Sequence, residues 1–431
     1  MIPSATNYDC IVIGGGPSGS TTAALVADAG FKTLLLERDV EPRRKVGESL
    51  MPETYWVFKR LGVLDDMKSG LFTQKVGVQF VSSSGKESSP FVFTRHDPHE
   101  CSRTWHVERA KFDQFLLENA KQKGVEVVRG ARVVEVVFDN DRATGVRVAA
   151  TTPPGTTAST DGLPPNTDST IINAKVIVDA AGQAGVLGSR FGLRKPNPKF
   201  RKTAIWGHFR GSRRDLIEGG VMTVCFRTQS NNSWFWHIPL SNDIVSIGVV
   251  GDADYFFRPG AGTPDEVFAA EVADCPAMQK RLEGTEKVAG LDVVKEYSYA
   301  TNRSSGDGWV LVGDSWGFID PIYSSGVWFA LKSGQLAADA IIEGLKNGDT
   351  SGEQLGKWVP EFAKGTNWVR KLAEAWYCGQ FRVGKFIREY PHHVGPMTDI
   401  LIGRIFHPGA GDIFNDLDPW LERMKAEGVT S

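Results

Sequence analysis

The sequence predicts a mixed α/β fold with three parts: a domain of alternating strands and helices, an inserted antiparallel β-sheet and a helical C-terminal region. The first part is indicated near the N-terminus, where an apolar strand at residues 8–13 runs into a glycine-rich turn and a helix-like stretch at residues 20–29. Alternating segments at residues 220–227, 233–239 and 243–250 indicate strands of a sheet. From Gln354 onward the composition is helical and aromatic.

The turn after the first strand reads GGGPSG at residues 14–19 and has the spacing G-x-G-x-x-G. Gly14 allows a tight turn, Gly16 lets the backbone approach a pyrophosphate, and Gly19 permits close packing of the following helix. Ser18 lies in the same turn, where the start of the helix offers free N–H groups to a phosphate. This strand-turn-helix context predicts a Rossmann-like domain that binds a dinucleotide.

An acidic residue narrows the choice of dinucleotide. Residues 32–36 form a second apolar strand that ends at Glu37, close to the ~20-residue distance at which Rossmann domains place a ribose-binding acid. A carboxylate there accepts hydrogen bonds from both ribose hydroxyls and disfavours a 2′-phosphate. FAD or NAD is therefore expected rather than NADP.

Composition excludes several other classes of protein. The chain of 431 residues has 49 Lys and Arg against 51 Asp and Glu, so its net charge of -2 gives no field that would concentrate nucleic acid. Its five cysteines form no C-x-x-C pair, which argues against a disulfide framework and against a zinc site. No apolar run is long enough to span a membrane, and the N-terminus does not read as a signal peptide. A cytoplasmic protein without a metal, a membrane span or a nucleic-acid partner is expected.

Residues 234–239 read WFWHIP, which places Trp234 and Trp236 on one face of a predicted strand. Taken alone, these side chains are also what aromatic packing in an ordinary half-buried strand would require.

Three further segments resemble a known family. Residues 310–314 (VLVGD) and 176–182 (VIVDAAG) are apolar strands with polar ends, and residues 107–109 read VER. All three resemble FAD-binding segments of the glutathione-reductase-type flavoprotein monooxygenase superfamily. The resemblance implies FAD as the cofactor, with Asp314 at the ribityl chain and Arg109 beside the flavin. The W-x-W-x-I-P string is similar to that of the flavin-dependent halogenases within this superfamily, in their phenol- and pyrrole-type branch.

The segment after Asp314 matches the halogenase pattern F-x-x-P-x-x-S-x-G from Phe318 to Gly326. A Ser-Ser-Gly turn that opens a helix leaves several backbone N–H groups around a small concavity, which favours an anion. The resemblance implies chloride or bromide beside Ser325 and Gly326. The same helix start could instead cap the pyrimidine edge of the flavin, as in related hydroxylases.

Lys75 lies in a K-x-G-x-x-F segment that resembles the phenol- and pyrrole-type halogenases, and Ser49 lies in a G-E-S stretch similar to the one near their flavin. The resemblance implies that reduced FAD, oxygen and halide make hypohalous acid, which Lys75 binds or carries as a haloamine for transfer to the substrate. Trp234 and Trp236 would separate the flavin from the acceptor. Without the resemblance, Lys75 would be read as a solvated residue at a strand end.

The resemblance also implies a domain division. Residues 1–74, 100–185 and 290–345 would form the FAD-binding domain, residues 75–99 and 186–289 the substrate-side β-sheet domain, and residues 346–431 the helical C-terminal region. Residues 151–170 are rich in Pro, Thr and Gly and are expected to form an extended hairpin loop.

The predicted function is FAD-dependent halogenation of an electron-rich phenol or pyrrole-type ring, free or bound to a carrier protein. No second glycine motif is present for a nicotinamide cofactor, so a separate flavin reductase is expected to supply reduced FAD. Tyr323 stands where tryptophan-acting relatives usually have Glu, which makes free tryptophan an unexpected substrate. The alternatives are a hydroxylase or isoprenoid-type reductase on the same fold, and a flavin-binding sensor without turnover.

Overall fold

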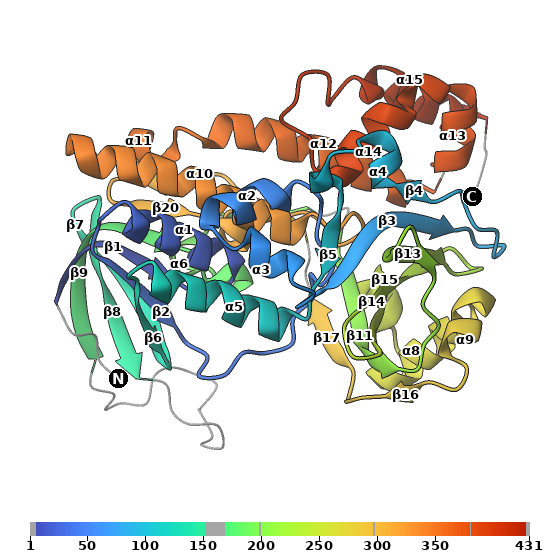
Figure 1. Cartoon of the computed structure of the whole chain (residues 1–431), viewed down its shortest axis with the longest axis horizontal. Helices are drawn as coiled ribbons and strands as arrows, with labels where there is room; N and C mark the ends of the chain where they lie inside the picture. The colour runs from blue at the N-terminus through green and yellow to red at the C-terminus, as the bar shows by residue number, and fades with distance from the viewer. Residues whose placement is uncertain (1–5, 151–168, 198–199, 296–297, 380, 428–431) are drawn as a thin grey trace.

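The computed structural model describes residues 6–150, 169–197, 200–295, 298–379 and 381–427. Two large sheets organise these residues, with helices around them (Figure 1). The first sheet has the order β19-β20-β9-β1-β2-β6, and β8 and β7 continue from β9. Its strands are β1 (Asn7–Ile13), β2 (Thr33–Glu37), β6 (Glu126–Arg129), β7 (Ala131–Asp139), β8 (Arg142–Ala150), β9 (Ser169–Asp179), β19 (Ser305–Gly306) and β20 (Trp309–Leu311).

The second sheet has the order β16-β11-β15-β14-β13-β3-β4, with β5, β12 and β17 paired to its members. Its strands are β3 (Thr73–Val81), β4 (Phe91–Val92), β5 (Thr104–His106), β11 (Lys202–Arg210), β12 (Leu216–Ile217), β13 (Gly220–Arg227), β14 (Ser233–Pro239), β15 (Ile244–Asp252), β16 (Glu286–Lys287) and β17 (Asp292–Lys295). A small third sheet joins β10 (Arg194–Pro196), β18 (Tyr299–Thr301) and β21 (Gly317–Phe318).

The α-helices are α1 (Pro17–Asp28), α2 (Thr54–Leu61), α3 (Leu64–Lys68), α4 (Phe93–His96), α5 (Arg109–Gln122), α6 (Val186–Arg190), α7 (Ala253–Phe256), α8 (Pro264–Ala273), α9 (Pro276–Leu282), α10 (Gly326–Asn347), α11 (Gly352–Gly356), α12 (Val359–Tyr377), α13 (Val383–Glu389), α14 (Val394–Ile402) and α15 (Ile413–Ala426). Figure 1 shows α8 and α9 beside the second sheet, and α13, α14 and α15 grouped above β3 and β4.

The parallel core of the first sheet follows from the run of apolar residues on both faces of its central strands. From Cys10 to Ile13 of β1, and in the residues of β2 and β9 that pair with them, every side chain is buried, as expected for strands covered on both sides. Helix α1 lies against β1, β2 and α10, and small residues make this close packing possible: a Cβ at Gly334 of α10 would lie 2.6 Å from the carbonyl oxygen of Ser18. The predicted α/β fold class is confirmed.

The second sheet differs from the prediction in one respect. Its pairings are antiparallel except for β3, which runs parallel to β13. This pairing inserts β3 between β13 and β4, so that Lys75 becomes a residue of the second sheet. Because the two strands of a parallel pair are joined by a long crossover, no local pattern around Lys75 could have indicated that β3 pairs in parallel with β13.

Residues 151–168 of the expected hairpin loop lie outside the described residues; the strands on either side, β8 and β9, pair antiparallel. Within the described part of the chain, no helix is both long and apolar enough to cross a bilayer. The domain boundaries stay a prediction.

Candidate active site

A cavity of about 1280 Å³ lies between the carboxyl ends of the parallel strands and the face of the second sheet. This volume exceeds the ~300–1,000 Å³ of most small-molecule sites, so it can hold a dinucleotide together with a smaller molecule. The carboxyl edge of a parallel sheet is also where α/β folds bind nucleotides. Of the predicted site residues, Gly14, Gly16, Ser18, Glu37, Ser49, Arg109, Trp234, Trp236, Asp314 and Gly326 line it.

The turn from β1 to α1 has the geometry that its glycines predict. Gly14 has a φ of 106°, and a Cβ there would lie 2.5 Å from the carbonyl oxygen of Ala180. A Cβ at Gly19 would lie 2.0 Å from the carbonyl oxygen of Gly14, so Gly19 allows the helix to approach the turn and does not itself line the cavity. Apart from Gly16 and its neighbours in the chain, no atom lies within 4 Å of a Cβ built on Gly16, which lines the cavity. The space beside Gly16 is therefore open to a phosphate.

Glu37 ends β2 at the cavity wall with its carboxylate fixed by the backbone. One carboxylate oxygen accepts from the N–H of Gly15 at 2.7 Å and the other from the N–H of Asp39 at 2.8 Å. These bonds orient the carboxylate and leave further lone pairs for ribose hydroxyls.

Arg109 and Asp314 also line the cavity. Arg109 makes a two-pronged ion pair with Asp113, at 2.8 and 3.0 Å, and also donates to the carbonyl of Val46 at 2.6 Å. Burial raises the pKa of Asp314 to about 6, against the opposing effect of the Arg109 charge. Together with the open space at Gly16 and the fixed Glu37 carboxylate, these residues fit FAD.

The N-terminus of α10 also reaches the cavity. Ser324 has a φ of 58°, an uncommon conformation for a side chain other than glycine, and it lines the cavity with Gly326. Ser325, the N-cap residue, makes no side-chain capping bond, and its 1% exposed side chain is not part of the wall. Ser324 and Gly326, and not the predicted Ser325, are therefore the residues of this turn that line the cavity.

Trp234 and Trp236 project from β14 into the cavity wall with their ring centres 6.3 Å apart. The Trp236 indole N–H donates to the Ser246 hydroxyl at 3.1 Å. The Trp234 indole N–H donates to the hydroxyl of Tyr377 at 2.8 Å, and Tyr377 in turn donates to Asp320 at 3.1 Å. Both rings are fixed by hydrogen bonds as well as by packing, because a buried indole N–H needs a partner.

Asp320 is a wall residue that sequence reasoning missed as a site candidate. It is 3% exposed and lines the cavity. Burial raises its pKa to about 7, with hydrogen bonds from the Ile322 N–H and Tyr377 acting in the opposite direction. Its carboxyl group can therefore gain or lose a proton near neutral pH. Its place between the Phe318 and Gly326 motif positions was the available signal, but Tyr377 is 143 residues from Trp234 and gave none.

Lys75 is buried, at 1% exposure, and is not a wall residue of the cavity. Its ammonium nitrogen donates to the Ser49 hydroxyl and to the carbonyl of Leu50, both at 2.9 Å. Burial lowers its pKa to about 7. The alternative reading of Lys75 as a solvated residue at a strand end is therefore wrong. Lys75 lies one hydrogen bond behind the wall, and Ser49 is the wall residue that connects it to the cavity.

A second buried pair at the wall also escaped sequence reasoning. Glu48, at 2% exposure, lies 3.0 Å from the Nε2 of His208, which is 6% exposed, and Glu48 lines the cavity. The two residues are 160 positions apart, so only the sheet brings them together.

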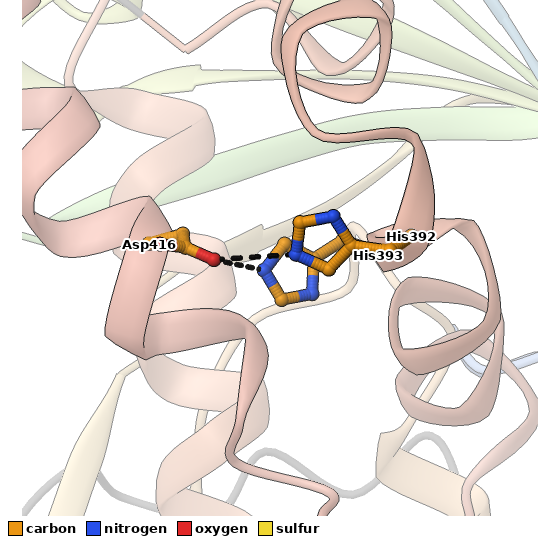
Figure 2. A group of neighbouring side chains, drawn as sticks. All are labelled: His392, His393 and Asp416. Carbon is orange, nitrogen blue, oxygen red and sulfur yellow. Dashed lines mark hydrogen bonds and ion pairs between the residues drawn. The ribbon is translucent and has the colours of Figure 1, made fainter.

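One group among the described residues could hold a metal ion, and it lies in the C-terminal helical region. Figure 2 shows His392 and His393 directed at Asp416, with distances of 3.3 and 2.8 Å from their Nε2 atoms to the same carboxylate oxygen. None of the three lines the cavity. Hydrogen bonds between the rings and the carboxylate account for these contacts.

The family described as tryptophan halogenase matches residues 9–102 and 93–386 of the chain. The 1H-pyrrole-2-carbonyl-(peptidyl-carrier protein) chlorinase of Pseudomonas fluorescens is 33% identical, over 80% of this chain and 78% of that protein. The solved structure of the flavin-dependent brominase Bmp2 is 26% identical, covers 97% of this chain and 100% of that chain, and has a TM-score of 0.83. The myxobacterial chondrochloren halogenase CndH, an FAD-dependent halogenase, is 31% identical, covers 86% of this chain and 83% of that chain, and has a TM-score of 0.76.

Proposed function

Because the chain belongs to the flavin-dependent halogenase family, whose members halogenate aromatic substrates with FAD and halide, we propose that it halogenates an electron-rich phenol or pyrrole-type ring through Lys75. The observation that carries the proposal is a buried lysine one hydroxyl behind the wall of a cavity that fits FAD. A pyrrole carried by a protein is favoured as substrate, since this is the substrate of the Pseudomonas fluorescens relative.

The reagent that this site must handle is hypohalous acid, which bound reduced FAD supplies with oxygen and halide. The chain's own residues have three tasks. The turn from β1 to α1, with Glu37, Arg109 and Asp314, holds the cofactor. The backbone at Ser324 and Gly326 attracts the halide by the N–H groups that begin α10. The remaining task, control of the oxidant, belongs to Lys75.

Lys75 suits this task because its pKa is lowered to about 7. Near neutral pH the ammonium and the free amine are then both populated. The ammonium can donate a hydrogen bond that polarises the acid. The amine can instead attack the halogen, so that the oxygen–halogen bond breaks, a haloamine forms and the hydroxide leaves as water with the amine proton. An exposed lysine, with a pKa near 10.4, would be almost entirely protonated and would offer only the first route.

The test is a reaction with the purified protein, FAD, a flavin reductase with NADH, and chloride or bromide. The acceptors are a panel of free phenols, free pyrrole-2-carboxylate, and the same acyl group loaded on a carrier protein. We expect a mass increase of one halogen in place of one hydrogen, only when halide and flavin are both present. A product that gains oxygen instead would contradict halogenation, and product from the free acid alone would contradict the carrier-bound substrate. Supplying chemically reduced FAD in place of the reductase tests the need for that partner.

A second test concerns Trp234 and Trp236, which we propose form the barrier between flavin and acceptor. Replacing both with leucine is expected to destabilise the fold by roughly 3–5 kcal/mol, because each is at most 4% exposed. Halogenation should fall, and oxygen addition should become detectable if the acceptor gains access to the flavin. Product masses and a denaturant unfolding curve measure these effects.

The matched control is Trp309→Leu, which removes a fully buried ring at β20 that does not line the cavity. It should cost a similar amount of stability per ring removed and leave the product mass unchanged. A folded Trp234→Leu/Trp236→Leu protein that halogenates at the parent rate would mean that the pair only fills space in the sheet.

A further inference from the structure

A chain of buried hydrogen bonds continues from Lys75 beyond Ser49. The Ser49 hydroxyl lies 2.8 Å from the hydroxyl of Thr223, and that hydroxyl lies 2.8 Å from the Nε2 of His106. The Nδ1 of His106 lies 2.9 Å from the carbonyl oxygen of Pro239. The four side chains that form these hydrogen bonds are each at most 3% exposed, and burial of this kind strengthens a hydrogen bond.

The direction of these bonds is set at the far end from Lys75. The Pro239 carbonyl can only accept, so His106 Nδ1 carries a hydrogen and donates it. In a neutral imidazole the Nε2 atom is then an acceptor, so the Thr223 hydroxyl donates its single hydrogen to it. The Ser49 hydroxyl must therefore donate to Thr223, which leaves the Ser49 oxygen to accept from Lys75.

The neutral state of His106 is favoured by its surroundings. Burial lowers its pKa well below the usual value, and the positive charge of Lys75 acts in the same direction. The His237 and Arg214 charges lower it further, while the Pro239 carbonyl favours the protonated ring. A protonated His106 would donate from Nε2 as well and would reverse the two hydroxyls.

The backbone holds the members of this chain together. Ser49 forms a β-bridge with His106 of β5. Lys75 of β3 pairs with Thr104, which lies two residues before His106 on β5. Thr223 lies on β13, the parallel neighbour of β3. Ser49 and Thr223 line the cavity, whereas Lys75 and His106 lie behind its wall.

We propose that His106 is a positioning residue for halogenation, which acts through Thr223 and Ser49 to hold the Lys75 nitrogen in one place and favour its charged form. The proposal rests on the proposed function of Lys75. Without His106 the two hydroxyls can turn around, and Ser49 can then donate to the lysine and favour the free amine.

The experiment compares parent, His106→Phe, Thr223→Val and Thr223→Ser proteins. For each, halogenated product and total oxidation of reduced FAD in air are measured from about pH 5.5 to 9. The ratio of the two rates isolates transfer of the halogen from cofactor turnover. We expect the ratio to fall roughly tenfold in His106→Phe and Thr223→Val, the loss typical of one mispositioned hydrogen-bonding group. The pH midpoint of the ratio should shift lower by up to about one unit, because the charged lysine has lost an acceptor. Thr223→Ser, which keeps the hydroxyl, should retain the parent ratio.

Lys75→Met provides the reference that separates the two proposals. If it halogenates as the parent does, the role of Lys75 is wrong and that of His106 falls with it. If it loses halogenation while folded His106→Phe and Thr223→Val keep the parent ratio and midpoint, only the role of His106 is overturned. A fall of both rates together with the melting temperature would assign His106 to the fold alone and would also overturn the proposal.

Discussion

Replacing Lys75 with methionine is expected to lower halogenation by at least ~100-fold while oxidation of reduced FAD in air continues, because positioned acid or electrostatic groups contribute about 10²-fold or more. The two rates should separate because Lys75 lies behind the wall at Ser49, outside the group of residues that hold the cofactor. Methionine matches the length and volume of the aliphatic part of lysine, so the core should keep its packing. Product mass and oxygen consumption, followed in one reaction, measure the separation.

Lys332→Met is the matched control. Among the described residues, Lys332 is the other lysine that has its pKa lowered by burial, and it does not line the cavity. It should leave both rates unchanged. A folded Lys75→Met protein that halogenates at the parent rate would make Lys75 a structural residue.

Lys75→Met should also change how the free energy of unfolding depends on pH. The pKa of Lys75 falls from 10.5 in the unfolded chain to about 7 in the folded protein, so between these values unfolding takes up a proton. The free energy of unfolding therefore rises with pH across this window, and Lys75→Met removes that contribution. Relative to the parent, the variant should be most stable near pH 6 and lose this advantage toward pH 10. Urea unfolding of both proteins at both pH values measures this difference in the free energy of unfolding. An equal difference at the two pH values would contradict a buried lysine with a lowered pKa.

Gly16→Val is expected to weaken FAD binding by at least ~100-fold, because hydrogen bonds to a charged phosphate contribute about 1.5–3 kcal/mol each and a side chain here would block more than one. The protein itself should tolerate the change. Apart from Gly16 and its neighbours in the chain, no atom lies within 4 Å of a Cβ at Gly16, and its φ of -74° suits any residue. Titration of FAD, followed by quenching of flavin fluorescence, measures the affinity.

Gly19→Val provides the contrast, because its Cβ would lie 2.0 Å from the carbonyl oxygen of Gly14. That variant should lose folded protein as well as FAD, whereas Gly16→Val should keep the circular dichroism spectrum of the parent. Unchanged FAD affinity in Gly16→Val would place the cofactor elsewhere in the cavity.

What the sequence alone predicted well was local in origin. The turn from β1 into α1 depends on the positive φ of Gly14, which glycine adopts readily, and on a close approach at Gly19 that a Cβ would block. Residues adjacent in the sequence therefore determine this turn. The strands ending at Glu37 and before Asp314 are apolar runs whose pattern reports burial directly. The resemblance added FAD and halide chemistry to these elements, and the comparisons confirmed both.

The surroundings of the proposed catalytic lysine were decided only by the tertiary structure. Ser49 and Thr223 are 174 residues apart, and His106 is 117 from Thr223, yet the three share one line of hydrogen bonds behind the cavity wall. These residues come together because β3 pairs in parallel with β13, and burial of side chains over the whole sheet determines that pairing. The lowered pKa of Lys75 has the same origin, because desolvation depends on everything packed around an atom and on no neighbour in the sequence.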